Sequence, residues 1–288
     1  MIALGALVAL ATGIAYNLGA ALQKREVVDV PVGTKGLLRA LVKRKIWLAA
    51  TTLSTIAWVG QVAALALAPV ALVVPLLAAG SAVLVVLGVR FLHERFRASE
   101  LAGVALVTIG AAAAGASEAG SSASHVPLHF GVQVVVAAVA AVCALGVLRW
   151  RSGVAYGAAS GFGFAAVAIY SKEIGDGFAR TGFGAVPHLL ASPSPYLLLG
   201  ASLAALSLLQ AGFQRANAAS VMAALSVPES IGPLIAGFWL YHERYPHGIA
   251  AGVLPAGLAC AITGSFLLAR HGRKLGEPVA SDDVRSSQ

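Results

Sequence analysis

The stretch "NAASVMAALSVPESIGPLIAGFWL", residues 217–240, decides how this chain folds. A helix crosses the hydrocarbon core of a membrane with about 20 mostly apolar residues, and this stretch is long and apolar enough to do so. Its centre, "SVPES" (226–230), nevertheless places Pro228 and the carboxylic acid Glu229 inside the apolar run. A charge at that depth costs about 2.5–3.5 kcal/mol on insertion scales, so the acid needs an explanation.

The composition of the whole chain extends the membrane interpretation beyond this stretch. Of the 288 residues, 58% are hydrophobic and only 11% are charged, with a mean hydropathy of +0.83. A soluble globular domain carries about 25% charged residues, and so few charges cannot cover a surface in water. The composition therefore predicts an integral membrane protein that has a lipid bilayer as its solvent, and no cofactor motif is visible.

Apolar runs of spanning length recur along the chain and predict an all-α fold with nine transmembrane helices. The predicted spans are residues 2–23, 46–68, 70–92, 99–117, 130–149, 152–172, 195–214, 217–240 and 248–269.

The distribution of lysine and arginine predicts the orientation of these helices. Seventeen of the 20 basic residues fall on one side, seven of them in segment 24–45 and four in the tail 270–288, which is polar and predicted to be disordered. Basic residues favour the cytoplasmic face. We therefore expect a multi-pass protein of the cell (inner) membrane, with the N-terminus outside and the C-terminus in the cytoplasm. The net charge of +8 then reflects this anchoring and predicts no nucleic-acid partner.

An internal repeat organises the predicted helices. "HERF" (93–96) and "HERY" (242–245) are offset by 149 residues, and an offset of 148 pairs Gly13 with Gly161. The chain thus divides into a first repeat, residues 1–149 with five helices, and a second, residues 150–269 with four. Because equivalent helices are five spans apart, the second copy is inverted in the membrane, as in many secondary transporters. The missing tenth helix leaves a face where a homodimer is an open alternative.

The motifs of the first half resemble those of a known family. "ALAPVALVVPLLAAGSAVLVVLGVRFLHERFRASELAGVALVTIG" (66–110) resembles the EamA-like branch of the drug/metabolite transporter superfamily. With nine helices, "LQKRE" (22–26) and "LAPVALVVPL", the chain is similar to the NIPA-type magnesium transporters and their bacterial relatives. The resemblance implies a transporter fold, and it implies magnesium as one substrate alternative.

Glu229 is the main candidate for a functional residue. Pro228 before it and Pro75 in the first half each remove a backbone N–H, which predicts a local helix break that exposes carbonyls to a cavity. Ser226 and Ser230 flank the acid. Two interpretations stay open: a protonated acid that hydrogen-bonds a neighbouring helix, or a site that binds protons, cations or substrate.

Further polar residues within the predicted helices are candidates for the same pathway, with interhelical hydrogen bonding as the alternative for each. They are Asn17, Gln61, Tyr170 and Gln210.

These features favour a secondary transporter over other classes. The leading hypothesis is alternating-access transport of a metabolite, amino acid or drug, coupled to protons or to exchange, through Glu229. The alternative is a magnesium or other divalent-cation transporter in which Glu229 is a metal ligand, since Mg²⁺ prefers carboxylate oxygens. A non-transporting membrane scaffold is a remote alternative. Because no convergent acid–base or nucleophilic set is visible, we expect no enzyme activity.

Overall fold

The computed structural model describes residues 2–32, 36–67, 70–92, 97–117, 129–240 and 248–272. The "HERF" and "HERY" motifs and the predicted tail beyond residue 272 lie outside the described residues. In the described part the chain is helical and contains no strand, which confirms the all-α class. In chain order, the helices are α1 (Ile2–Val28), α2 (Leu37–Leu41), α3 (Lys45–Leu67), α4 (Val70–Phe91), α5 (Ala98–Ser117), α6 (Phe130–Leu148), α7 (Gly153–Thr181), the 3₁₀ turn η1 (Gly182–Ala185), α8 (Val186–Ala191), α9 (Ser194–Phe213), α10 (Ala218–Trp239) and α11 (Ala250–Gly272).

Six of the described helices are long and apolar enough to cross a membrane. These candidate spans are Ala3–Val28, Phe130–Leu148, Gly153–Ile174, Ser194–Phe213, Ala218–Trp239 and Ala250–Leu268. The chain is therefore a multi-pass membrane protein in a lipid bilayer. The other three predicted spans coincide with helices α3, α4 and α5. That these three helices also cross the membrane stays a prediction.

The helices expose large apolar side chains and bury small ones. Leu7, Val142 and Trp239 are 66%, 69% and 77% exposed, while Ala50 and Ala205 are fully buried. In water this arrangement would be unfavourable, but lipid tails are as apolar as leucine, and small buried residues let helices approach closely. The outer surface is thus suited to lipid.

One expectation about helix breaks is wrong, and one helix is longer than its predicted span. The predicted span 152–172 agrees with the candidate span Gly153–Ile174, while helix α7 itself continues to Thr181. The later part packs closely on α8, because a Cβ added to Gly177 would lie 3.3 Å from a methyl group of Leu189. The predicted breaks at Pro75 and Pro228 do not occur, since α4 and α10 run through them as continuous helices. Each proline instead removes one N–H from an intact helix.

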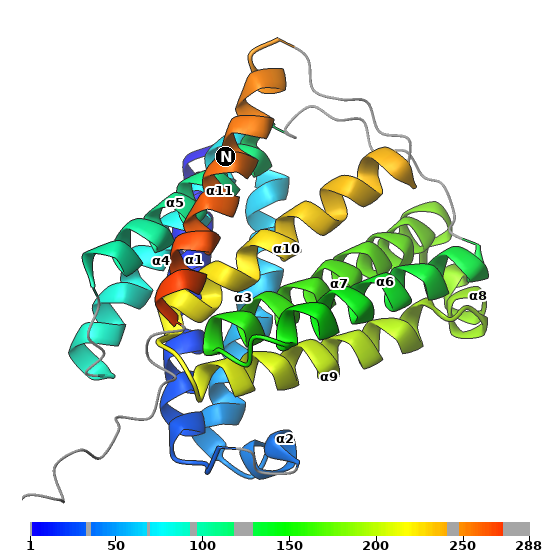
Figure 1. Cartoon of the computed structure of the whole chain (residues 1–288). Coiled ribbons are helices and arrows are strands. Elements are labelled where there is room, and N and C mark those ends of the chain that lie inside the picture. Colours follow the sequence, from blue (N-terminus) through cyan, green and yellow to red (C-terminus); the bar gives the residue numbers. More distant parts are fainter. Residues whose placement is uncertain are drawn as a thin grey trace, which may run out of the picture.

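The helices form two groups. Helix α1 packs along α3 and α4, and α7 packs along α6, α9 and α10, while α11 packs against α5. In Figure 1, α1, α3 and α11 run steeply, whereas α6, α7 and α9 run across the view. The two groups meet at the lower left of that view, near the last turns of α1 and α9, and diverge from there.

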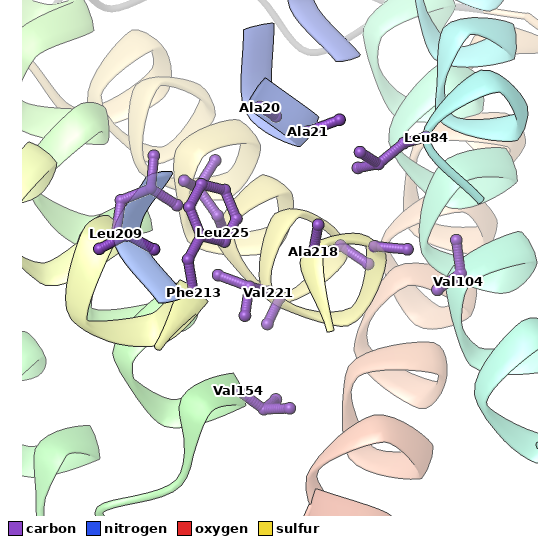
Figure 2. Close-up of a cluster of buried hydrophobic side chains, with 14 of the residues drawn as sticks. Ala20, Ala21, Leu84, Val104, Val154, Leu209, Phe213, Ala218, Val221 and Leu225 are labelled. Atoms are coloured by element: carbon purple, nitrogen blue, oxygen red, sulfur yellow. The ribbon is translucent and has the colours of Figure 1, made fainter. Parts of the chain in front are cut away.

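The two groups meet at the end of the bundle that we call the basic end, because the basic residues of segment 24–45 that the structure describes lie there. This end contains α2, the last turns of α1 and α9, and the first turns of α3, α7 and α10. The largest apolar cluster among the described residues lies there and joins both groups of helices. Figure 2 shows its members from six helices: Ala20 and Ala21 of α1, Leu84 of α4, Val104 of α5, Val154 of α7, Leu209 and Phe213 of α9, and Ala218, Val221 and Leu225 of α10.

Polar bonds strengthen this end. The Lys24 side chain of α1 is buried, and its Nζ donates to the carbonyl oxygens of Phe213 and Ala216 at the end of α9, the second at 2.6 Å. These carbonyls lack partners within a helix, and a cation is favourable at a helix C-terminus. The amide of Gln214 likewise donates to the carbonyl of Val30 at 2.8 Å. The basic end is therefore closed by apolar packing and by bonds between α1 and α9.

The opposite end is packed differently. The apolar clusters that the described residues form there are two separate small ones. One contains Ala9 and Ala64 and belongs to α1, α3 and α4. The other contains Ile169 and Ala236 and belongs to α6, α7 and α10. No described apolar cluster joins the two groups of helices there, which agrees with their divergence in Figure 1.

Candidate functional site

The candidate site lies half-way along α10. This helix begins after Asn217, whose side-chain oxygen accepts a hydrogen bond from the backbone N–H of Ser220 at 2.8 Å and so caps the first turn. Glu229 lies twelve residues after Asn217. Leu225 is the last buried α10 residue of the apolar cluster at the basic end, and Val227 packs against that cluster, so Glu229 lies just beyond it.

The side chain of Glu229 is exposed, although the residue lies near the middle of α10. Many protein atoms lie in its wider surroundings. The carboxyl group is therefore accessible, and it lies just beyond the apolar cluster that joins the two groups of helices.

Tyr16 from the centre of α1 faces the same region. Its side chain is half-buried, and α1 contacts α10, the helix that carries Glu229. The two residues come from the two diverging groups of helices, and each lies near the middle of its helix. The site is thus built between the groups rather than within one of them.

Prolines add backbone oxygens to this region. Pro228 and Pro233 both lie inside α10. Neither has an N–H to donate, so the helix cannot satisfy the carbonyls of Ala224 and Glu229, which are four residues earlier. Glu229 can therefore present both its carboxylate and its backbone carbonyl, a combination that suits a proton or a cation. Pro233 was missed as a site residue, although its spacing of four from the acid is visible in the sequence.

The two serines that flank Glu229, Ser226 and Ser230, are partly buried. The hydroxyl of Ser226 donates to the carbonyl of Met222 in its own helix at 3.0 Å. Ser226 lies three residues before Glu229 and therefore shares its face of α10. Ser230 is half-buried. The first serine is partly engaged by the helix, and both remain close to the acid along the chain.

Asn17 belongs to a helix crossing next to the site. Its amide donates to the carbonyl of Gly13 in the same helix at 2.8 Å, and a Cβ added to Gly80 of α4 would lie 2.8 Å from the same amide nitrogen. Asn17 thus fills the contact between α1 and α4 beside Tyr16. Tyr16 was not predicted, because only the approach of α1 to α10 reveals it.

Two of the other predicted pathway residues are held in interhelical hydrogen bonds. Tyr170 is fully buried and donates to the carbonyl of Gln133 in α6 at 2.8 Å. Gln210 is fully buried near the end of α9 and donates to the side chain of Gln23 at 2.7 Å. Both make interhelical hydrogen bonds, the alternative role considered for them. Gln61 is half-buried on α3.

The described residues contain no group of three or more histidine, cysteine, aspartate or glutamate side chains that would hold a metal ion. A cation at Glu229 would therefore use one carboxylate together with carbonyl, hydroxyl or water oxygens. No protein-family model, curated protein or solved structure matches the chain. Conclusions about function consequently depend on the geometry of this region.

Proposed function

We propose that the chain is a secondary active transporter that moves a small solute by alternating access, with Glu229 in the pathway. The position of Glu229 carries the proposal: it is central in α10, accessible, and just beyond the closed basic end. A purely structural acid would hydrogen-bond to a neighbouring helix, and in the described residues Glu229 has no such partner. An accessible carboxylate can instead bind and release a proton or cation during each cycle.

Two helix crossings support the inverted repeat that this mechanism uses. A Cβ on Gly13 of α1 would lie 2.8 Å from the carbonyl oxygen of Leu77 in α4, and a Cβ on Gly161 of α7 would overlap the carbonyl oxygen of Leu225 in α10. Both residues of the second pair follow those of the first by 148 positions. The packing of α1 on α3 and α4 likewise corresponds to the packing of α7 on α9 and α10.

The two repeats differ in one helix contact, and an alternating-access mechanism requires such a difference between them. Helix α10 packs against α5, but α4 and α11, the corresponding pair, do not pack along each other in the described residues. Interchange of these two arrangements would open the closed end and close the open one. With nine spans and the basic end in the cytoplasm, this structure would represent the outward-open state of a cell (inner) membrane transporter with its N-terminus outside.

For the substrate, we favour a small organic solute, such as a metabolite, amino acid or drug, exchanged or coupled to protons. This matches the sequence resemblance to the EamA-like drug/metabolite transporters. A specific observation keeps the cation alternative: Pro233 leaves the Glu229 carbonyl beside its carboxylate, and both are oxygen ligands. The NIPA-like Mg²⁺ transporter is therefore the second candidate.

Reconstitution in liposomes tests the proposal. Vesicles hold either a pH-sensitive or a Mg²⁺-sensitive dye, and a panel of amino acids, organic cations and organic anions is added outside, or MgCl₂ in the second case. We expect one class to produce flux that Glu229→Gln lowers by about 100-fold, which corresponds to ~2.7 kcal/mol. Asp29→Asn serves as the matched control, because it makes the same kind of change at an exposed carboxylate just after the end of α1.

Thermal melting of each variant shows that folding is retained. Equal flux from native protein and Glu229→Gln would remove the acid from the pathway. No flux of any probe from folded native protein would favour the scaffold alternative.

A further inference from the structure

A groove lies between α2 and α9 at the basic end, away from Glu229. Its volume is about 340 Å³, and it is lined by residues 36–38 together with Ser207, Ala211, Gln214 and Arg215 of α9. This volume is at the lower limit of pockets that hold small molecules. It suits a polar headgroup with a few adjoining carbons rather than a large ligand.

The α9 side of the groove continues as a ridge of residues four apart, which are neighbours on a helix surface. Leu199 and Leu203 are each 59% exposed, and Ser207, Ala211 and Arg215 follow at the same spacing. The ridge therefore changes from exposed leucines toward the middle of the membrane to a guanidinium at the basic end. A ligand that matches it has an apolar chain and an anionic head.

Arg215 is held in place for such a head. Its guanidinium carbon lies 4.5 Å from the centre of the Tyr156 ring, and one of its nitrogens donates to the carbonyl of Ala211 at 2.6 Å. A guanidinium has five N–H donors in a planar fork that matches phosphate oxygens. The remaining donors of this ordered side chain can therefore bind a phosphate without a large loss of side-chain entropy.

The charges around the groove are mainly positive. Arg39 and Lys43 follow the lining residues 36–38 along the chain, are exposed, and have no carboxylate within ion-pair distance in the described residues. The acids nearby along the chain, Glu26 and Asp29, are both engaged by Arg44 at 3.4 and 3.3 Å. Such a basic surface attracts anionic lipids of the cytoplasmic leaflet.

We propose that this groove is a specific site for one anionic glycerophospholipid of the inner leaflet, with its phosphate on Arg215 and an acyl chain along Leu203 and Leu199. The proposal depends on the membrane placement of the basic end and is independent of transport through Glu229. A bound lipid would bridge α2 and α9, and so would stabilise the contact between α1 and α9 that closes this end.

The test uses the full chain, purified in neutral detergent and stripped of lipid. Short-chain phosphatidylglycerol, phosphatidylcholine with the same chains, and inorganic phosphate are titrated separately, with thermal midpoint and native mass spectrometry as readouts. We expect phosphatidylglycerol alone to raise the midpoint and to remain bound as one copy. Loss of a charge-assisted phosphate bond in Arg215→Gln should weaken this binding about tenfold.

Two further variants distinguish a specific lipid site from nonspecific attraction of anionic lipids to a basic surface. Ala211→Phe keeps every charge but fills the groove, and we expect it to abolish the retained lipid. Lys43→Gln removes one charge beside the groove and should leave binding within about twofold, as for a surface charge. Equal effects of both headgroups, an equal effect of phosphate alone, equal losses in Arg215→Gln and Lys43→Gln, or full binding by Ala211→Phe would each overturn the proposal.

Discussion

The two ends of the bundle are built from the same kinds of helix but packed in opposite ways. At the basic end one apolar cluster joins α1, α4 and α5 to α7, α9 and α10, and Lys24 adds bonds from α1 to α9. At the other end, the described apolar clusters are two small ones that do not join the groups. The described clusters thus join the two groups of helices at the basic end alone, which predicts that Glu229 is reached from the opposite end. Glu229 lies where the joined part stops.

The largest expected effect is a difference in chemical accessibility between the two ends. In a background with Cys143→Ser and Cys260→Ser, Glu229→Cys should react with a membrane-impermeant thiol reagent from the side opposite the basic end. If the state open to the basic end is populated at about 1%, reaction from that side should be about 100-fold slower. The rate of modification in oriented vesicles measures the ratio.

Ser220→Cys provides the matched control, because Ser220 is buried in the closed end of the same helix. It should resist the reagent from both sides. Equal reactivity of Glu229→Cys from the two sides would show that the ends do not differ in access.

The second expected effect concerns the glycines at the two equivalent crossings. Gly161→Val and Gly13→Val each place methyl groups against a backbone carbonyl of the neighbouring helix, that of Leu225 or Leu77. Overpacking of this kind should lower the free energy of unfolding by about 2 kcal/mol in each case. Thermal and denaturant melting in detergent measure the change. Gly200→Val is the control, since nothing lies within 4 Å of a Cβ there. If Gly200→Val lowered the free energy of unfolding as much as Gly161→Val or Gly13→Val, close packing at the crossings would not be the cause.

A third, smaller effect is expected from the polar bonds of the basic end. Lys24→Met keeps the length of the side chain but leaves the carbonyls of Phe213 and Ala216 without its ammonium group. We expect a loss of about 1–2 kcal/mol in the free energy of unfolding, as for a hydrogen bond to a charged group. The same change should raise the reactivity of Glu229→Cys from the basic end. Unchanged reactivity would mean that Lys24 stabilises the fold without influencing which end is open.

The smallest effect is expected at Tyr16. Tyr16→Phe removes one hydroxyl from the region of Glu229, and transport should fall about fivefold, in line with ~1 kcal/mol for a hydrogen bond. Tyr170→Phe removes a hydroxyl that binds the Gln133 carbonyl away from Glu229. It should lower stability slightly and leave the rate of transport by the folded protein unchanged. If Tyr170→Phe lowered the liposome flux and Tyr16→Phe did not, Tyr16 would not belong to the transport pathway.

The positions of helices could be predicted from sequence because hydrophobic length alone sets them. The span expected at residues 217–240, for example, is α10 from Ala218 to Trp239. The extension of α7 to Thr181 could not be predicted in this way, since it depends on contacts with α8. Length and hydropathy describe each helix separately, whereas the extension of α7 depends on the packing of two helices, α7 and α8.

The same limit applies to the site. Glu229 could be identified because an acid in an apolar run is conspicuous without any partner. Tyr170 and Gln210 were equally visible, but their hydrogen bonds to Gln133 and Gln23 are set by which helices become neighbours. Tyr16 has no distinguishing pattern along the chain, and its relevance arises only from the approach of α1 to α10.

The bonds of Lys24 have a consequence for how the protein is made. The acceptor carbonyls follow Lys24 by 189 and 192 residues. At a synthesis rate of about 5–20 residues per second, they emerge from the ribosome roughly 10–40 s after the lysine. During that interval the first helix is inserted without them, and its final position can be fixed only when α9 arrives. A nascent chain stalled before Phe213 should therefore leave Lys24 open to an amine-reactive label that the finished protein resists.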